Sequence, residues 1–371
     1  MLACADDQRR IRERNERNNC RASAGRVRVI PAKQPASRNE SSTQLIDSAV
    51  AKGAISAETG LVYNVFALHA DPRLPPEYRG KGGEGIDDSL MGDIASKFET
   101  LSARARATLA PFFIPPYYAG SWWALQHGAV APAASARARA LAQPTCHVDA
   151  LLADWESTGT GNNQVRIWWQ TGQPNDQARA MAMAKDIDTT IWPKLASLMK
   201  RSSLPDGGST IPCRGGDDRL DIALVPGLGR AETLPNSFVS CSETSSHINL
   251  PNAGTTRGTL VHELMHAFQY TYKTAGSCDE YRWWREASAQ WAEDYVYPTE
   301  IGNVEQLAAD LYLSMPGKPL EFKNDKHEYG AYLFPFLLAR TLRPELIQTI
   351  WANDGSYDSL AAINTLSLIH I

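Results

Sequence analysis

The chain has 371 residues, a formal net charge of −4, 43% hydrophobic residues and 21% charged residues. These values are those of an ordinary globular protein, so they exclude a fully disordered chain, a coiled coil and a collagen-like rod. The near-neutral charge balance argues against a dedicated nucleic-acid-binding protein. The sequence has no run of about 18 apolar residues, which predicts that no transmembrane helix is present.

Composition changes along the chain and predicts four regions. Residues 1–39 are polar and rich in arginine, which predicts a disordered basic leader; an arm that binds nucleic acid or a membrane surface is the alternative. Residues 40–118 have apolar side chains at helical spacing, which predicts a helical N-terminal region, either a pro-region that covers a cleft or a separate packing domain. The alanine-rich residues 119–143 predict a linker, and residues 144–371 are expected to form the larger, C-terminal region.

The helical region is expected to contain three helices. Apolar spacing predicts the first from Ser41, the second near Leu61 and the third over residues 90–109. Residues 71–88 between them are rich in proline and glycine, which predicts a loop.

Strands and helices are both predicted in the C-terminal region, residues 144–371. Short apolar runs over 165–169, 221–226 and 246–250 predict strands. Residues 176–200 predict one long helix, which Pro193 is expected to kink.

The motif His-Glu-x-x-His follows the last of these strands and is formed by His262, Glu263 and His266. On a helix, capped by Thr255 or Thr256, the two histidines leave the same face and can bind one zinc ion at about 2.0–2.1 Å. Glu263 can then reach a water molecule on the metal without binding the metal itself. Apolar neighbours predict a buried helix, in which these polar groups need a partner, and a cation supplies one. Two core histidines bonded to carbonyl groups are the alternative.

A catalytic zinc site needs a third protein ligand. The metzincin pattern is excluded, because Gln269 and Tyr272 stand where that pattern has glycine and histidine. Glu286 lies 20 residues after His266 in a second amphipathic helix and is flanked by small residues. Its tryptophan-rich surroundings favour pairing with a cation, and a surface ion pair is the alternative for this carboxylate.

The sequence HELMH followed by WWREASAQWAED resembles the gluzincin group of zinc metallopeptidases, the thermolysin-like HExxH…E proteins. It is most similar to bacterial exported metalloproteases with a Trp-x-x-Glu-Ala second helix, over about residues 255–297. The resemblance implies an α+β, zincin-like catalytic domain with a small mixed sheet and an active-site helix. It also implies zinc as the cofactor, with His262, His266 and Glu286 as ligands and Glu263 as general base.

Thermolysin itself has an aspartate four residues after its glutamate ligand, where this chain has Gln290. Either the amide oxygen of Gln290 or another group, such as Asp294, is expected to orient a histidine ligand. The resemblance further implies that the strand over 246–250 is a sheet edge that pairs with a substrate backbone.

Peptide hydrolysis also needs a donor to the oxyanion that develops on the substrate carbonyl. Tyr329, Tyr332 and His327 are the candidates, because they lie near a downstream helix that could close the cleft. The expected function is therefore that of a zinc metalloendopeptidase acting on protein or peptide substrates. A zinc aminopeptidase or other hydrolase on the same site, and a metal-binding scaffold without turnover, are the alternatives; the sequence does not indicate an oligomeric state.

The cellular location can be inferred from the six cysteines and from the first residues of the chain. The chain start has neither the basic nor the apolar part of a signal peptide, so either the protein stays inside the cell or its true beginning is missing. Because proteases of the resembled type are exported, an extracellular, periplasmic or cell-surface location is expected. Disulfides are then expected among the cysteines of the catalytic region, Cys146, Cys213, Cys241 and Cys278, with reduced thiols as the alternative.

Overall fold

The computed structural model describes residues 2–4, 20–22, 40–80, 89–127, 152–206, 216–238, 240–299, 303–324 and 326–366. The chain divides into a small unit, Met1–Asn39, and a large compact unit, Glu40–Ile371. In the small unit, strands β1 (Leu2–Cys4) and β2 (Cys20–Ala22) pair antiparallel. The predicted leader otherwise falls outside what the structure describes.

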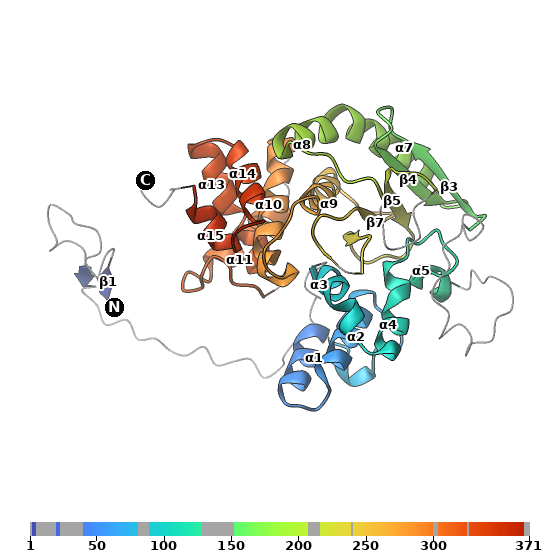
Figure 1. Ribbon diagram of the computed structural model, residues 1–371, viewed down its shortest axis with the longest axis horizontal. Helices are drawn as coiled ribbons and strands as arrows, with labels where there is room; N and C mark the ends of the chain where they lie inside the picture. The colour runs from blue at the N-terminus through green and yellow to red at the C-terminus, as the bar shows by residue number, and fades with distance from the viewer. Residues whose placement is uncertain are drawn as a thin grey trace. The chain divides into compact units, whose positions relative to one another are not determined.

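A five-stranded mixed sheet forms the centre of the large unit (Figure 1). Its strands are β3 (Trp155–Gly159), β4 (Val165–Gln170), β5 (Leu220–Val225), β6 (Glu232–Pro235) and β7 (Ser246–Pro251). The order across the sheet is β3-β4-β5-β7-β6, with β4, β5 and β7 parallel and the two outer strands antiparallel to their neighbours. The three predicted strands are confirmed, whereas β3 and β6 were not predicted.

The edge strand nearest the His-Glu-x-x-His helix is β6 rather than the strand that the sequence predicts. Strand β7, which contains residues 246–250, pairs with β5 on one side and with β6 on the other. The prediction that β7 forms the edge is therefore wrong. The chain between β5 and β7 forms β6, a short antiparallel strand. Its sequence, Glu-Thr-Leu-Pro, alternates too little between apolar and polar residues to predict a strand.

One face of the sheet is covered by α7 (Asp176–Asp186), a π-turn (Ile187–Ile191) and α8 (Trp192–Met199), together with α9 (Arg257–Gln269). The predicted helix over 176–200 is thus confirmed as one continuous helical run. The backbone widens in the π-turn just before Pro193, because proline lacks an N–H and its ring crowds the preceding turn.

The other face is covered by the N-terminal helices α1 (Ser42–Ala51), α2 (Ala57–Leu68), α3 (Ser89–Lys97), α4 (Ala103–Leu109) and α5 (Trp122–Gln126). Trp168, Ala223 and Leu234 of the sheet share one core with these helices. Figure 1 shows these blue and cyan helices below the sheet and α9 in this view. The sheet therefore separates two hydrophobic cores.

Two predictions for the N-terminal region need correction in detail. The expected third helix over 90–109 is interrupted by a 3-10 turn, Phe98–Thr100, and the hydroxyl of Ser102 then caps α4. Residues 119–127 of the expected linker include α5, whose Trp123 is buried. Residues 128–143 are not among those described.

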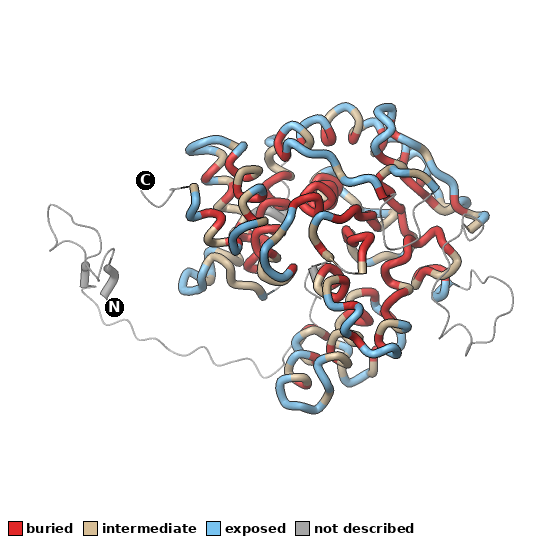
Figure 2. The backbone as a smooth tube through the Cα atoms, in the orientation of Figure 1, coloured by how far each residue is buried: buried red, intermediate tan, exposed pale blue. Residues whose placement is uncertain are grey.

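Helices dominate the last third of the chain: α10 (Cys278–Val296), α11 (Asn303–Leu313), α12 (His327–Gly330), α13 (Leu333–Thr341), α14 (Glu345–Asn353) and α15 (Ser359–Asn364). Figure 2 shows that α9 lies in the buried interior of this unit. Among the described residues, no helix combines the length and the apolar character needed to span a membrane.

A disulfide joins Cys241 to Cys278 and links the loop before β7 to the start of α10. Two of the four cysteines expected to form disulfides are thus paired. The other two, Cys146 and Cys213, belong to segments that the structure does not describe. Cys241 and Cys278 pack with Tyr270 in a small buried cluster, so the bridge holds the start of α10 near the end of α9.

Candidate metal centre and active site

Helix α9 places the two histidines and the glutamate of the motif in the protein interior. The hydroxyl of Thr256 accepts a hydrogen bond from the backbone N–H of Thr259 at 3.0 Å, which caps the helix as predicted. His262, Glu263 and His266 are all buried. Their polar atoms therefore need partners within the protein.

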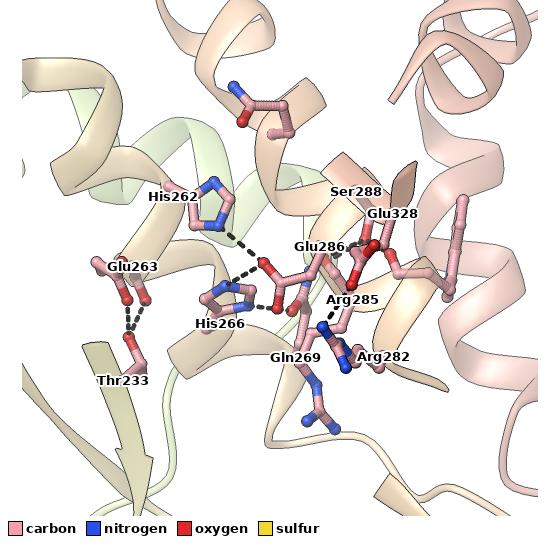
Figure 3. A network of polar contacts seen from close by, with 12 residues as sticks. Thr233, His262, Glu263, His266, Gln269, Arg282, Arg285, Glu286, Ser288 and Glu328 are labelled. Carbon is pink, nitrogen blue, oxygen red and sulfur yellow. Dashed lines mark hydrogen bonds and ion pairs between the residues drawn. The ribbon is translucent and has the colours of Figure 1, made fainter. Parts of the chain in front are cut away.

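Helix α10 brings the third predicted ligand to the same place. Glu286 is fully buried, and the small side chains of Ala287 and Ala289 beside it are buried as well. One ligand atom from each of His262, His266 and Glu286 can be chosen so that all three lie within 4.8 Å of one another. The structure therefore brings together the three residues that the sequence proposes as a metal centre (Figure 3).

Both histidines turn their Nε2 atoms toward the carboxylate. Oε2 of Glu286 lies 3.2 Å from Nε2 of His262 and 3.5 Å from Nε2 of His266. Burial opposes ionisation of Glu286, but the charge of His266 and the hydrogen bonds from both histidines hold its pKa well below the ordinary value. Burial likewise opposes a charged His262, but its hydrogen bonds to Glu286 and Glu293 raise its pKa well above the ordinary value.

The donor set fits a zinc ion. Two imidazole nitrogens and one carboxylate are the ligands that catalytic zinc sites use. Within the described part of the chain, Oε1 of the fully buried Glu286 has no hydrogen-bond partner. An ionised carboxylate with an unsatisfied oxygen between two imidazoles is suited to a cation.

Each histidine is also held from its other nitrogen. Nδ1 of His262 lies 3.1 Å from Oε1 of Glu293, and Nδ1 of His266 lies 2.8 Å from Oε1 of Gln269. Since both partner oxygens accept, both Nδ1 atoms donate. This arrangement presents the two Nε2 atoms to a metal.

The group that orients His262 differs from the two that the sequence favours. Gln290 acts through its amide nitrogen, which donates to Oε1 of Glu293 at 2.9 Å. Asp294 is partly buried, which raises its pKa, and it interacts with Arg340. The orienting carboxylate is therefore Glu293, which lies seven residues, or about two helical turns, after Glu286.

Gln269 is itself fixed by α10. Its amide nitrogen donates to the backbone oxygen of Arg285 at 3.1 Å and to the hydroxyl of Ser288 at 3.0 Å. With the nitrogen engaged, the amide oxygen is left to accept from His266. The spacing of three residues between His266 and Gln269 on one helix is the sequence signal that could have revealed this contact.

The candidate general base meets the edge strand. The hydroxyl of Thr233, on β6, donates to Oε2 of Glu263 at 2.7 Å, and Figure 3 shows this contact beside the histidines. Because β6 itself was not predicted, no feature of the sequence pointed to Thr233.

The three downstream candidates lie in different surroundings. The ring of Tyr329 stacks on the ring of His262, with centroids 6.0 Å apart and an angle of 23° between the planes. His327 donates from Nδ1 to the backbone oxygen of Phe322 at 2.9 Å and packs on the ring of Tyr312. Tyr332 is partly buried against the main core.

Tyr329 owes its place to an ion pair between helices. Glu328, which precedes it on α12, accepts from Nη2 of Arg282 on α10 at 2.6 Å. Glu328 also accepts the backbone N–H groups of Asn324 and Lys326 at 3.1 Å each. These contacts fix α12 against the helix that carries Glu286.

Comparison with known proteins finds similarity in structure alone. No family model matches the chain, and no curated protein matches it. One similar structure is a mutant two-domain M1 zinc metallopeptidase bound to L-arginine, with 14% identity over 57% of this chain and 48% of that one and a TM-score of 0.34. Another is a mutant M1 zinc metallopeptidase from Deinococcus radiodurans bound to a Tyr-Ser-Ala substrate, with 16% identity over 57% and 47% and a TM-score of 0.34.

A third similar structure is a mutant two-domain M1 zinc metallopeptidase bound to L-tryptophan, with 15% identity over 57% of this chain and 48% of that one and a TM-score of 0.35. The matched part of the chain thus spans about half the length of each of these structures.

Proposed function

We propose that this chain is a zinc-dependent peptidase, and specifically an endopeptidase. The observation that carries the proposal is the convergence of His262, His266 and Glu286 within 4.8 Å, with the carboxylate of Glu263 next to them and outside the ligand set. A metal site with three protein ligands leaves a coordination position open for catalysis.

Zinc bound at this centre would supply a Lewis acid and lower the pKa of a coordinated water. Glu263 takes a proton from the attacking water and delivers it to the nitrogen of the leaving amine. The oxygen of the water first bonds to the carbonyl carbon, which leaves a negative charge on the carbonyl oxygen, and the C–N bond breaks when the nitrogen receives the proton. The products are one carboxylic acid and one amine, so the atoms of water are fully accounted for.

The carboxylates near the site favour endopeptidase over aminopeptidase activity. An aminopeptidase needs an acidic group to hold the free amine of its substrate. In the described part of the chain, Glu293 is bonded to His262 and Glu328 to Arg282, so both are engaged in supporting the site. A scaffold without turnover would need the three ligands but not Glu263.

We also propose that the protein works in an oxidising compartment, outside the cell or in a periplasm. The disulfide between Cys241 and Cys278 supports this location, because disulfides persist mainly in such compartments.

The test is digestion of casein with and without a chelator, by the wild type and by Glu263→Gln. The variant should keep its zinc and lose hydrolysis, because the amide cannot take the proton. Glu345→Gln, which alters an exposed glutamate on α14, is the control and should behave as wild type. Unchanged casein digestion by Glu263→Gln would contradict the mechanism.

A second substrate separates the two kinds of peptidase. A peptide with an acetylated N-terminus has no free amine, so an endopeptidase cleaves it and an aminopeptidase does not. Cleavage confined to substrates with a free amine would favour the aminopeptidase alternative.

A further inference from the structure

Thr233 makes a contact that zinc binding does not require. Its hydroxyl lies 2.7 Å from Oε2 of Glu263, within the range of a hydrogen bond to an ionised carboxylate. Thr233 is fully buried, so bulk water does not compete for the bond. The contact joins the sheet edge to the residue that moves the proton.

Strand β6 directs this hydroxyl toward α9. Side chains alternate along a strand, and Glu232 and Leu234 on either side point to the opposite face. There Glu232 accepts from the amide of Asn249 at 2.9 Å, and Leu234 joins the N-terminal core. The backbone oxygen of Thr233 accepts from the hydroxyl of Tyr270 at 3.4 Å. These contacts fix the direction of the Thr233 side chain.

A general base works only when its accepting oxygen is held in place. A carboxylate turns about its last bond, and a hydrogen bond to one oxygen restricts that rotation. With Oε2 of Glu263 bonded to Thr233, the orientation of Oε1 is fixed as well.

We propose that Thr233 is a positioning residue for Glu263, acting through its hydroxyl on the proton-transfer step. The inference rests on the proposed peptidase function, since it assigns Thr233 a role in that reaction. Thr233 is fully buried and is not one of the three residues that could hold the metal.

A purely structural explanation makes a different prediction. The same hydroxyl lies 3.0 Å from the backbone oxygen of Glu263, a contact that would tie β6 to α9 whatever the reaction. If that contact were the whole role, losing the hydroxyl would lower stability without a specific effect on kcat.

The experiment compares Thr233→Val, which keeps the shape and removes the hydroxyl, with Thr233→Ser, which keeps the hydroxyl. Thr271→Val is the matched control, because Thr271 is also buried and bonds a backbone oxygen at the end of α9, that of Phe268 at 2.7 Å. All are loaded with zinc and assayed on the acetylated peptide, and zinc content and thermal unfolding are measured.

For Thr233→Val we expect kcat to fall roughly 10-fold to 100-fold, the loss typical for a hydrogen bond to a charged group. KM and zinc content should stay near wild type, since neither ligands nor substrate contacts change. Thr233→Ser should recover most of the rate. Thr271→Val should keep the wild-type kcat even if its unfolding temperature falls.

Crystal structures of the zinc-loaded variants give a readout that does not depend on activity. Glu263 should adopt more than one carboxylate orientation in Thr233→Val and a single one in Thr233→Ser. A single unchanged orientation in both, or equal kcat in Thr233→Val and wild type, would overturn the role of Thr233. If Thr233→Val does not fold, Thr233→Ala replaces it, and failure of both to fold overturns the role in favour of the structural explanation.

The same assays separate this failure from failure of the proposed function. If the wild type shows no chelator-sensitive hydrolysis of the acetylated peptide or of the same peptide with a free N-terminus, the peptidase function fails and the inference with it. If the wild type hydrolyses the peptide and Glu263→Gln does not, the function stands, and a full rate in Thr233→Val removes only the role of Thr233.

Discussion

Nε2 of His262 lies 3.2 Å from Oε2 of Glu286, although the two residues belong to different helices and are 24 positions apart in the chain. Because Glu286 is fully buried, an ionised carboxylate is stable here only with cationic partners around it. The two imidazoles provide these partners in the chain, and a zinc ion would bind all three side chains.

Glu286→Gln should therefore lose zinc, because a neutral amide is a poor ligand in place of a carboxylate. The loss in affinity should exceed the roughly 10-fold to 100-fold drop that is typical when a residue behind a ligand is changed. Competition with a chromophoric chelator measures the affinity, and metal analysis the stoichiometry. A wild-type affinity in this variant would mean that the third ligand lies elsewhere.

Glu293→Gln should weaken zinc binding by roughly 10-fold to 100-fold while leaving one ion per chain, because it removes the carboxylate that orients His262. Asp294→Asn is the control next in sequence, since Asp294 interacts with Arg340 rather than with a histidine. A larger loss in Asp294→Asn than in Glu293→Gln would show that the wrong carboxylate has been assigned.

Tyr329→Phe should lower kcat without changing zinc content. Its ring stacks on that of His262, whereas His327 packs on Tyr312 and Tyr332 packs against the main core. Loss of one such donor typically costs roughly 100-fold to 1,000-fold in kcat. Tyr332→Phe is the control, and equal rates in both variants would remove Tyr329 as the donor.

Asp221 should make stability depend on pH. Asp221 lies on β5, and its burial raises its pKa to about 6, although Trp168 donates a hydrogen bond to it at 2.8 Å. The folded state holds the proton more tightly than the unfolded chain, whose aspartate titrates at roughly 4. The protonated Asp221 therefore contributes its full stabilisation below roughly pH 4, and this contribution is lost as the pH rises through about 6.

Asp221→Asn removes this titration, since the amide stays neutral. At pH 8 the variant should be more stable than wild type by up to about 3 kcal/mol, and the gain should shrink as the pH falls through about 6. Urea unfolding between pH 5 and pH 8 measures the difference. A constant difference over this range would contradict the shifted pKa.

Helix periodicity explains which parts of the site could be predicted from the sequence. The spacing of His262 and His266 on one helix, and of Glu286 on the next, specifies which face each occupies. Gln269 and Glu293 lie on those same faces, three residues after His266 and seven after Glu286. Helical spacing could therefore have predicted their contacts with the histidines as well.

Contacts between strands and helices could not be predicted in this way. Thr233 depends on the pairing of β6 with β7, and a four-residue strand carries almost no pattern of its own. The expectation that β7 forms the edge came from the family resemblance, and without β6 no feature of the sequence argued against it. His327 was chosen for its chemistry, and its contact with the backbone oxygen of Phe322 depends on a local loop conformation that residue types do not specify.

The central sheet carries apolar side chains into both cores, and this arrangement couples the two halves of the large unit. On β4 alone, Trp168 enters the core shared with the N-terminal helices, while Ile167 and Trp169 enter the core shared with α9. Removing residues 40–127 would expose one whole face of the sheet to water. A fragment that starts at residue 144 should aggregate on expression, and the intact unit should melt cooperatively, in a single calorimetric transition.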